Sequence, residues 1–410
     1  RHVVMVNTFV NMTTVNVKIM DLVETFDTEK RYLTLGGFYP ISTDSRLKKY
    51  FHHFRGTFNT AISWLEWILL IIFLYKIFPD IVKISEGLLF YMTQSAFVCK
   101  LVNFIIKKNR MFTIENQLQN PLLTEVDEKE EKILIGFIKE VKLLAKFFRV
   151  LCVGCVLFYS LVPILDRSPD GIRKLPLPIW VPFNTQKYYH FLWFAIMFSL
   201  SIGAWTNSNI DILTIMLISI ATAQFEILKK RFENVVPPND STIPESVVKR
   251  RLTKCIVHFN EINSFVVTLE KTFSNGIFIQ FLCSVLVICL TGFQMLVISI
   301  KSIQFVLLIT YFNCMLCQII MYCWYGQLLL NSSDDITKAC FSSDWFLCSA
   351  KIQKIFITIM ERSKCPVTFR AGKFFTLNLK TLMAILRSSY SYFAVLQHVY
   401  RNRMHANNLD

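Results

Sequence analysis

The chain has 410 residues, of which 53% are hydrophobic and only 18% are charged. A protein with an ordinary water-facing surface carries more charge, so the composition favours a membrane protein. The formal net charge of +15 is also typical of nucleic-acid-binding proteins. Here the basic residues cluster at the ends of apolar stretches, and we expect no nucleic-acid partner.

Several stretches are long and apolar enough to cross about 30 Å of hydrocarbon. We expect seven membrane spans, at 58–78, 81–106, 147–165, 188–228, 273–299, 303–330 and 371–398. The fourth is long enough to continue beyond the membrane. The expected fold class is an all-α membrane protein of seven transmembrane helices.

The orientation follows from the basic clusters at the span ends. No cleavable signal is visible, because the first long apolar segment begins after residue 57 and is a full span. Lys48 and Lys49 precede the first span, Lys107 and Lys108 close the second, and 229–231 closes the fourth. The positive-inside rule then predicts a cytoplasmic N-terminus and, after seven crossings, an extracellular C-terminus.

The links between spans are unequal in length. The link at 166–187 is the one substantial extracellular loop, and its prolines predict a turn-rich cover. The cytoplasmic links are amphipathic at helical spacing over 125–146, 245–272 and 334–363. The apolar stripe of the first contains Ile133, Leu134, Phe137, Val141 and Leu144. We expect a cytoplasmic helical anchor domain, packed between subunits, or alternatively within one subunit or on the bilayer surface.

Twelve cysteines raise the question of disulfides or metal. The pairs Cys152/Cys155 and Cys314/Cys317 have the spacing of zinc ligands, but they fall within spans, where a thiol acts as a small hydrophobic group between helices. We therefore expect packing, with no metal and no cofactor. No set of nucleophile, base and metal ligand is visible, so an enzyme is not expected.

The last part of the chain carries a recognisable pattern. It consists of Tyr322 to Gln327, Ala339 to Trp345, Ser363 to Pro366, Ala371–Gly372 and Leu386 to Leu396. In this order and spacing the segments resemble the C-terminal signature of insect odorant receptors, and 175–182 is similar to the proline-rich third link of that family. Two departures are Phe341, where Tyr is frequent, and Lys364–Cys365, where Gln is frequent.

The resemblance implies an odour-specific tuning subunit, because the chain lacks the long insertion that the shared co-receptor has before the fifth span. Such a subunit would form a hetero-oligomer, a tetramer by family analogy, with co-receptor subunits in the plasma membrane of olfactory sensory neurons. It would bind a small volatile odorant, contact membrane lipids and pass cations through a central pore. The expected regions are 1–57 (cytoplasmic N-terminal region), 58–330 (spans one to six with the pocket), 331–370 (anchor helix and loop), 371–398 (pore helix) and 399–410 (extracellular tail).

An odorant pocket should be apolar and aromatic, with a few polar groups for orientation. The outer halves of spans two, three, four and six supply such side chains, although aromatic residues in spans also simply pack. The candidates are Phe90, Tyr91, Gln94, Phe158, Tyr159, Phe191, Phe194, Phe198, Phe305 and Tyr311.

The last span supplies the candidate pore lining. Residues at intervals of three and four share one helix face, and the face in question contains Met383, Leu386, Tyr390, Ala394 and Gln397. Ordinary packing within the subunit is the alternative. Pro366 should interrupt the helix from 334, and the final helix should resume near Ala371.

Charges within or near the spans are costly and need partners or water. We expect a structural role for Asp211, while Glu66, Glu86 and Arg149 could pair across helices or face water. Arg387 opposes cation conduction and is expected in a wide vestibule or against a neighbour.

The competing interpretations are a gustatory receptor of the same superfamily, a G-protein-coupled receptor and a secondary transporter. The gustatory ending differs from Ser391–Tyr392 to Gln397–His398 here. A G-protein-coupled receptor has the opposite orientation, and a transporter would need internal repeats that the chain does not show.

Overall fold

The computed structural model describes residues 18–165, 173, 175–236 and 244–407, with side chains to residue 402. The chain is almost wholly helical. Its elements are two short helices α1 (Asp27–Gly36) and α4 (Arg110–Leu118), a single turn α5 (Pro121–Thr124), and the long helices α2 (Arg46–Ile77), α3 (Ile81–Lys107), α6 (Glu128–Leu165), α7 (Tyr189–Glu233), α8 (Glu245–Val297), α9 (Ile303–Ser342), α10 (Ala350–Ser363) and α11 (Leu379–Asn407).

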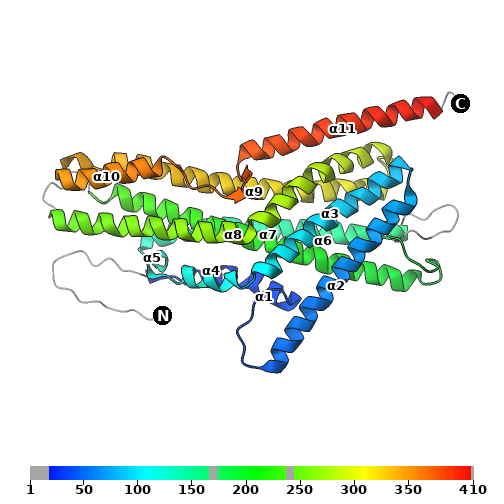
Figure 1. Ribbon diagram of the computed structural model, residues 1–410, viewed down its shortest axis with the longest axis horizontal. Helices are drawn as coiled ribbons and strands as arrows, with labels where there is room; N and C mark the ends of the chain where they lie inside the picture. The colour runs from blue at the N-terminus through cyan, green and yellow to red at the C-terminus, as the bar shows by residue number, and fades with distance from the viewer. Residues whose placement is uncertain (1–17, 166–172, 174, 237–243, 408–410) are drawn as a thin grey trace.

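The long helices α6, α7, α8 and α9 run side by side along the length of the molecule (Figure 1). At 45 residues, α7 is about 68 Å long, far more than a bilayer requires. We call the end of the bundle where α6 and α8 begin the extension end, and the opposite end the loop end. The fourth expected span therefore does continue beyond the membrane, as predicted.

Six helices in the described part of the chain are long and apolar enough to cross a membrane, namely α2, α3, α6, α7, α8 and α9. Each covers one of the first six expected spans, apart from one or two residues at a span end in α2, α7 and α8. The seventh expected span corresponds to α11, which is 29 residues long but markedly less apolar. The composition of α11 does not mark it as lipid-facing, and its crossing remains a prediction.

Helix α7 forms the centre of the core. Every residue from Ser208 to Phe225 is buried, which explains why the segment is apolar on all sides. At the extension end, Leu134 and Val141 of α6 are buried and pack in the core to which α7 contributes. For the stripe of α6, packing within one subunit, one of the expected alternatives, is what the structure shows, because α7 continues beside this part of α6.

The expected helix at 334–363 is also interrupted. Helix α9 ends at Ser342, a short 3-10 turn spans Trp345–Leu347, and α10 begins at Ala350. The turn is held by Gln353, whose amide donates to the carbonyls of Phe346 and Cys348 at 2.8 and 2.9 Å. Helix α10 then folds back along α9 (Figure 1).

The final helix begins at Leu379, later than the predicted Ala371. The intervening residues form a small hairpin of β3 (Arg370–Ala371) and β4 (Phe375–Thr376). Gly372 has a φ of +60°, a conformation that favours glycine, and its N–H donates to the Ser274 carbonyl at 3.2 Å. The hairpin packs on α8, and the final helix therefore begins after it, at Leu379.

The N-terminal region and the second link contain structure that the sequence analysis treated only as connections. Strand β1 (Lys18–Ile19) pairs antiparallel with β2 (Glu125–Val126). Helices α1 and α4 bury Leu33, Met111 and Ile114 in the core. These elements are too short to be recognised by periodicity, and tertiary packing stabilises them.

Candidate ligand pocket and pore helix

Three of the candidate aromatic residues meet between α3, α6 and α9. The ring centroids of Phe90 and Tyr159 are 5.6 Å apart and edge-on, and those of Tyr159 and Tyr311 are 6.4 Å apart. Thr93, one turn from Phe90, forms a hydroxyl hydrogen bond with Tyr311. The residues are 6 to 9 positions from the loop end of their helices, so the cluster lies about 9 to 14 Å inside that end.

The hydroxyl group of Tyr159 has an unusual environment. Its side chain is buried at 5% exposure, yet its oxygen has no hydrogen-bond partner among the described residues. A buried polar group without a partner costs roughly 1–3 kcal/mol. A ligand or a water molecule that hydrogen bonds there would remove this cost.

Two candidates from α3 face a different neighbour. The ring of Tyr91 stacks on Trp67 of α2 at 5.8 Å, and Gln94 donates to the Ser63 carbonyl of α2 at 3.1 Å. Trp67 in turn donates to Ser95 at 2.8 Å. These side chains join α2 to α3 and do not belong to the Tyr159 cluster.

The candidates from α7 lie on its outer surface. Phe191, Phe194 and Phe198 are 68%, 65% and 43% exposed, and Phe194 stacks on Phe198 at 6.3 Å. The structure therefore does not bring them to the cluster. Phe158 and Phe305 are half-buried, and Phe158 packs against the core.

The proline-rich link covers the loop end where it is described. Lys76 lies over the Trp180 ring at 4.1 Å from its centroid, the Trp180 N–H donates to the Leu69 carbonyl at 3.4 Å, and Leu177 is buried. The first part of this link, with Pro169 and Gly171, lies outside the described residues.

Below the aromatic cluster, a buried polar network joins four helices. Lys100 of α3 donates to Asp211 of α7 at 2.6 Å, and Tyr322 and Gln318 of α9 donate to the same carboxylate. Gln280 of α8 donates to Gln318 at 3.0 Å. The structural role expected of Asp211 fits this arrangement. Lys100, a charge within the second expected span, carried the same signal but was not among the charges that the sequence analysis singled out.

Two other expected charges pair across helices. Arg149 of α6 forms an ion pair with Glu29 of α1 and donates to Asn209 of α7 at 3.4 Å. Glu66 of α2 accepts a hydrogen bond from Ser199 of α7. Both residues thus have partners on other helices, an opposite charge for Arg149 and a neutral hydroxyl group for Glu66.

The cysteine pairs of α6 and α9 face each other, with the sulfur atoms of Cys152 and Cys314 3.6 Å apart. All twelve cysteines are free thiols. In the described part of the chain, no group of three or more His, Cys, Asp or Glu side chains is placed to hold a metal ion.

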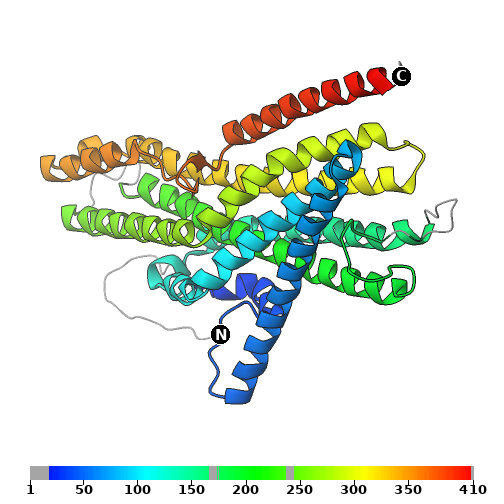
Figure 2. The ribbon, with the colours of Figure 1, turned by 45° about the vertical axis from the view of Figure 1, so that its right-hand side comes forward.

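Helix α11 lies on the outside of the bundle (Figures 1 and 2) and packs one face against α8 and α9. On that face Ile385 and Ser389 are buried, and the ring of Tyr400 lies 5.4 Å from that of Phe293. Of the candidate pore residues, Met383 and Tyr390 are 58% and 70% exposed, and Ala394 is exposed beside them. Leu386 and Gln397 are half-buried at the edge facing α8 and α9. The predicted face is thus largely uncovered within one subunit.

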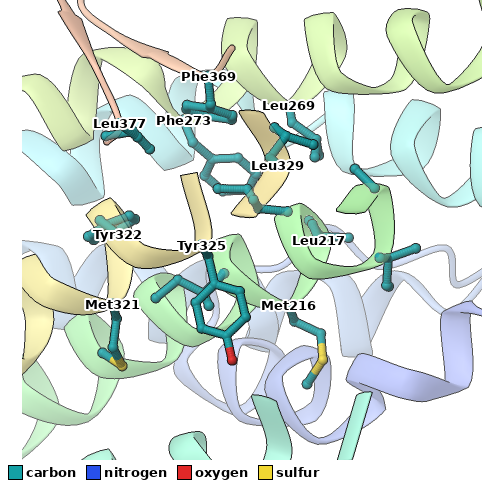
Figure 3. Packing of buried hydrophobic residues seen from close by; sticks show 14 of the residues in the cluster. Met216, Leu217, Leu269, Phe273, Met321, Tyr322, Tyr325, Leu329, Phe369 and Leu377 are labelled. Carbon is teal, nitrogen blue, oxygen red and sulfur yellow. The ribbon is translucent and has the colours of Figure 1, made fainter. Parts of the chain in front are cut away.

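The signature segments converge where α11 starts. Figure 3 shows Leu377 and Phe369 of the hairpin region beside Phe273 of α8 and Leu329 of α9, and all four side chains are buried. Gln327 accepts a hydrogen bond from the Leu379 N–H at 3.3 Å. The Val367 N–H, just after Pro366, donates to Ser333 at 2.7 Å. The segments that carry the family resemblance therefore hold the start of α11 in place.

A separate hollow lies at the extension end, far from the aromatic cluster. Charged side chains from the start of α6, the end of α7 and α8 line it, namely Asp127, Lys129, Glu130, Lys230, Arg231, Arg251 and Lys254, with Asn234 and Cys255. Such a lining suits ions and not a volatile apolar molecule.

Comparison with known proteins agrees with this architecture. The sequence profile of the family described as 7tm Odorant receptor matches residues 80–390, which is more than half of the chain. Odorant receptor 94a of Drosophila melanogaster is 26% identical over 231 residues, covering 55% of this chain and 58% of the relative. The mosquito Odorant receptor Or1 of Anopheles gambiae is 23% identical over 384 residues, covering 84% and 90%.

The fold is also similar to a solved receptor. The olfactory receptor OR5 of Machilis hrabei superposes with a TM-score of 0.81 at 17% identity, covering 92% of this chain and 98% of OR5. The fly receptor is matched over less than two thirds of its length, whereas the family profile, the mosquito receptor and the solved fold extend through most of the helices. This chain is a multi-pass membrane protein of the insect odorant receptor family.

Proposed function

We propose that this chain is the odour-binding subunit of an odorant-gated, non-selective cation channel that it forms with co-receptor subunits in the plasma membrane of olfactory sensory neurons. The observation that carries the binding site is the cluster of Phe90, Tyr159 and Tyr311 with the unpartnered Tyr159 hydroxyl. An apolar wall with one convergent polar group is the usual composition of a small-molecule site. Machilis hrabei OR5, which has a similar fold, was solved in complex with eugenol.

The uncovered face of α11 supports the channel part of the proposal. A helix with Tyr390 and Met383 exposed needs partners, and four such helices around an axis would enclose a pore. A narrow ring of bulky side chains closes a pore by excluding water. Arg387, also exposed, points to a side of α11 next to this face and would lie in a wider part of the path.

The N-terminal end of α11 connects the proposed odorant site to the proposed pore helix through α9. The aromatic cluster and the buried Gln318 and Tyr322 all involve α9, and α9 holds the start of α11 through Gln327. Odorant binding that shifts α9 would therefore be transmitted to α11. The seven-crossing topology, with the N-terminus inside and the C-terminus outside, belongs to the same proposal.

The binding site is tested by dose–response curves in cells that express this chain with the co-receptor. Tyr159→Ala removes a large apolar contact worth roughly 1–3 kcal/mol, so the half-maximal odorant concentration should rise about tenfold or more, while the reversal potential stays the same. Tyr159→Phe should reduce potency only for odorants that hydrogen bond. Tyr91→Ala is the matched control because this ring faces α2. Equal effects of Tyr91→Ala and Tyr159→Ala would exclude the proposed cluster.

The partnership is tested by expressing the chain alone. The exposed face of α11 predicts weak or absent odorant-evoked current without the co-receptor and robust current with it. Equal currents at equal surface expression would contradict the obligate pairing.

A further inference from the structure

The first turns of α2 extend beyond the hydrocarbon region on the side of the extension end. At 32 residues, α2 is about 48 Å long, against about 30 Å of hydrocarbon. Its uncharged stretch, interrupted only by Glu66, runs from Gly56 to Tyr75. Residues 46–55 therefore lie at the membrane boundary, and this end of α2 stands away from the bundle in both views (Figures 1 and 2).

Aromatic side chains on this part of α2 are uncovered. Tyr50 and Phe51 are each 67% exposed, and Phe54 and Phe58 are 58% and 48% exposed. The spacing of three and four residues places Phe51, Phe54 and Phe58 along one face. Such a row is unfavourable in water, but helices at a membrane surface bury Trp, Phe and Leu side chains at the boundary between headgroups and acyl chains.

Basic side chains surround the same place. Arg46, Lys48, Lys49 and Arg55 come from α2, and Lys107, Lys108 and Arg110 come from the end of α3 and the start of α4. The two groups lie on either side of segment 37–39. A Cβ atom on Gly37 would lie 2.8 Å from the His52 carbonyl oxygen of α2, and the Tyr39 hydroxyl donates to Glu115 of α4 at 2.6 Å.

Within the described residues, these seven cations form no ion pairs. The guanidinium groups of Arg55 and Arg110 donate to the carbonyls of Thr34 and Lys271, at 2.7 and 2.9 Å, and these carbonyls carry no net charge. The positive charge is thus available to a partner.

We propose that this basic–aromatic patch, formed by the seven cations and by Tyr50, Phe51, Phe54 and Phe58, binds the headgroup of an anionic phospholipid. The phosphate groups lie between the start of α2 and the α3–α4 turn, and the rings sit among the adjoining acyl chains. Clusters of basic residues immediately beside a membrane span bind acidic lipids with about 1 kcal/mol for each Lys or Arg near the surface. The aromatic row distinguishes a lipid from a free phosphate compound, which would not contact it.

The test measures binding of a fluorescent short-chain phosphatidylinositol 4,5-bisphosphate to the purified full-length chain in detergent, by fluorescence anisotropy. The competitors are the unlabelled lipid, phosphatidylcholine of the same chain length and inositol 1,4,5-trisphosphate. The acidic lipid should compete at least about tenfold better than either of the other two.

The variant Lys48→Gln/Lys49→Gln/Lys108→Gln should weaken binding about tenfold or more. The matched control is Lys249→Gln/Lys351→Gln/Lys354→Gln, which removes the same charge from exposed positions at the far extension end and should leave the affinity within about twofold, because added salt screens distant charges. Lys48→Arg/Lys49→Arg, which keeps the charge, should bind like the unmodified chain. Phe51→Ser/Phe54→Ser should weaken binding of the lipid but not of inositol trisphosphate.

Equal competition by inositol trisphosphate would show a free-phosphate site and overturn the lipid assignment. Equal competition by phosphatidylcholine would overturn headgroup recognition. Equal weakening by the two triple variants would show a general charge effect and overturn the patch. Size-exclusion profiles of all variants identify any that fail to fold. If the triple glutamine variant fails to fold, Lys48→Arg/Lys49→Arg and Phe51→Ser/Phe54→Ser test the proposal, and binding of the lipid that Phe51→Ser/Phe54→Ser leaves unchanged would overturn it.

Discussion

Lys100 and Asp211 form an ion pair with only 3% and 0% of their side chains exposed. Removing two charges from water is costly, and such a pair persists only where other groups complete its hydrogen bonds. Here Asn207 accepts from Lys100 at 2.8 Å, and Tyr322 and Gln318 donate to Asp211. The network fixes the relative rotation of four helices beneath the proposed pocket.

Breaking this pair from one side should destabilise the protein strongly. Lys100→Met leaves a buried carboxylate without its cation, at a cost of roughly 3–5 kcal/mol, so the midpoint of thermal unfolding in detergent should fall clearly. Lys100→Met combined with Asp211→Leu removes both charges and should recover part of that loss. A double variant that is less stable than Lys100→Met alone would show that the pair is not the cause.

At the scale of elements, the close approach of α9 to the segment before α11 decides where the last helix starts. A Cβ atom on Gly326 would lie 2.3 Å from the Leu377 Cβ and 2.4 Å from the Leu377 carbonyl oxygen. Only glycine fits, because the opposing atoms are backbone and the root of a side chain. Leu377 itself is fully buried, so the segment that contains it cannot move away from α9 to make space for a larger side chain.

Gly326→Ala should therefore displace the base of α11. We expect reduced surface expression or altered basal current of the co-expressed channel. Gly136→Ala is the matched control, since a Cβ there meets nothing within 4 Å and alanine favours helix by about 0.5–1 kcal/mol. Normal gating and expression of Gly326→Ala would exclude this contact as the determinant of the position of α11.

The predicted pore face of α11 can be tested against a matched tyrosine. Tyr390 and Tyr392 are 70% and 56% exposed, and two residues along a helix turn the side chain by about 200°. Tyr390→Ala should change basal leak or cation selectivity by a partial amount, because partner subunits supply the rest of the ring. Tyr392→Ala should change them less. Bi-ionic reversal potentials that are the same for Tyr390→Ala and the unmodified channel would remove this face from the pore.

At the scale of the whole molecule, the helices at the extension end are joined by ion pairs, as in the domains of water-soluble proteins. Ion pairs connect its helices, such as Lys229–Asp335 at 3.1 Å and Arg231–Glu130 at 2.6 Å. What stays uncovered there is apolar surface at the turn between α9 and α10, where Phe341, Phe346, Leu347 and Ile357 are 51% to 71% exposed. A surface of this kind is typical of an interface between subunits.

The orientation of the molecule in the membrane is tested by its glycosylation motifs at Asn11, Asn239 and Asn331. Asn331 lies in α9 toward the extension end, and the other two lie outside the described residues. With the extension end in the cytoplasm, none is modified, and glycosidase treatment should leave the electrophoretic mobility unchanged. If glycosidase treatment produced a faster-migrating band, and replacement of these asparagines abolished that shift, the opposite orientation would be correct.

Length and hydropathy were enough to predict the first six membrane spans, and the long apolar run at 188–228 was enough to predict that the fourth continues beyond the bilayer. These features are local, because a helix of about 20 apolar residues is stable in hydrocarbon whatever its neighbours are. The ordered motifs from Tyr322 to Leu396 likewise identified the family, which the profile match over 80–390 confirmed.

The tertiary structure alone decided which side chains meet. Tyr91 and Tyr159 looked equivalent as aromatic residues of apolar spans, but the rotation of each helix directs one toward α2 and the other toward Tyr311. The start of α11 at Leu379 depends on Gly326 and Ser274, which are distant in the sequence, and the pairing of Lys100 with Asp211 crosses 111 positions. Periodicity gives the face of a helix but not its neighbour, because the packing of side chains on other helices determines how each helix is rotated and where it ends.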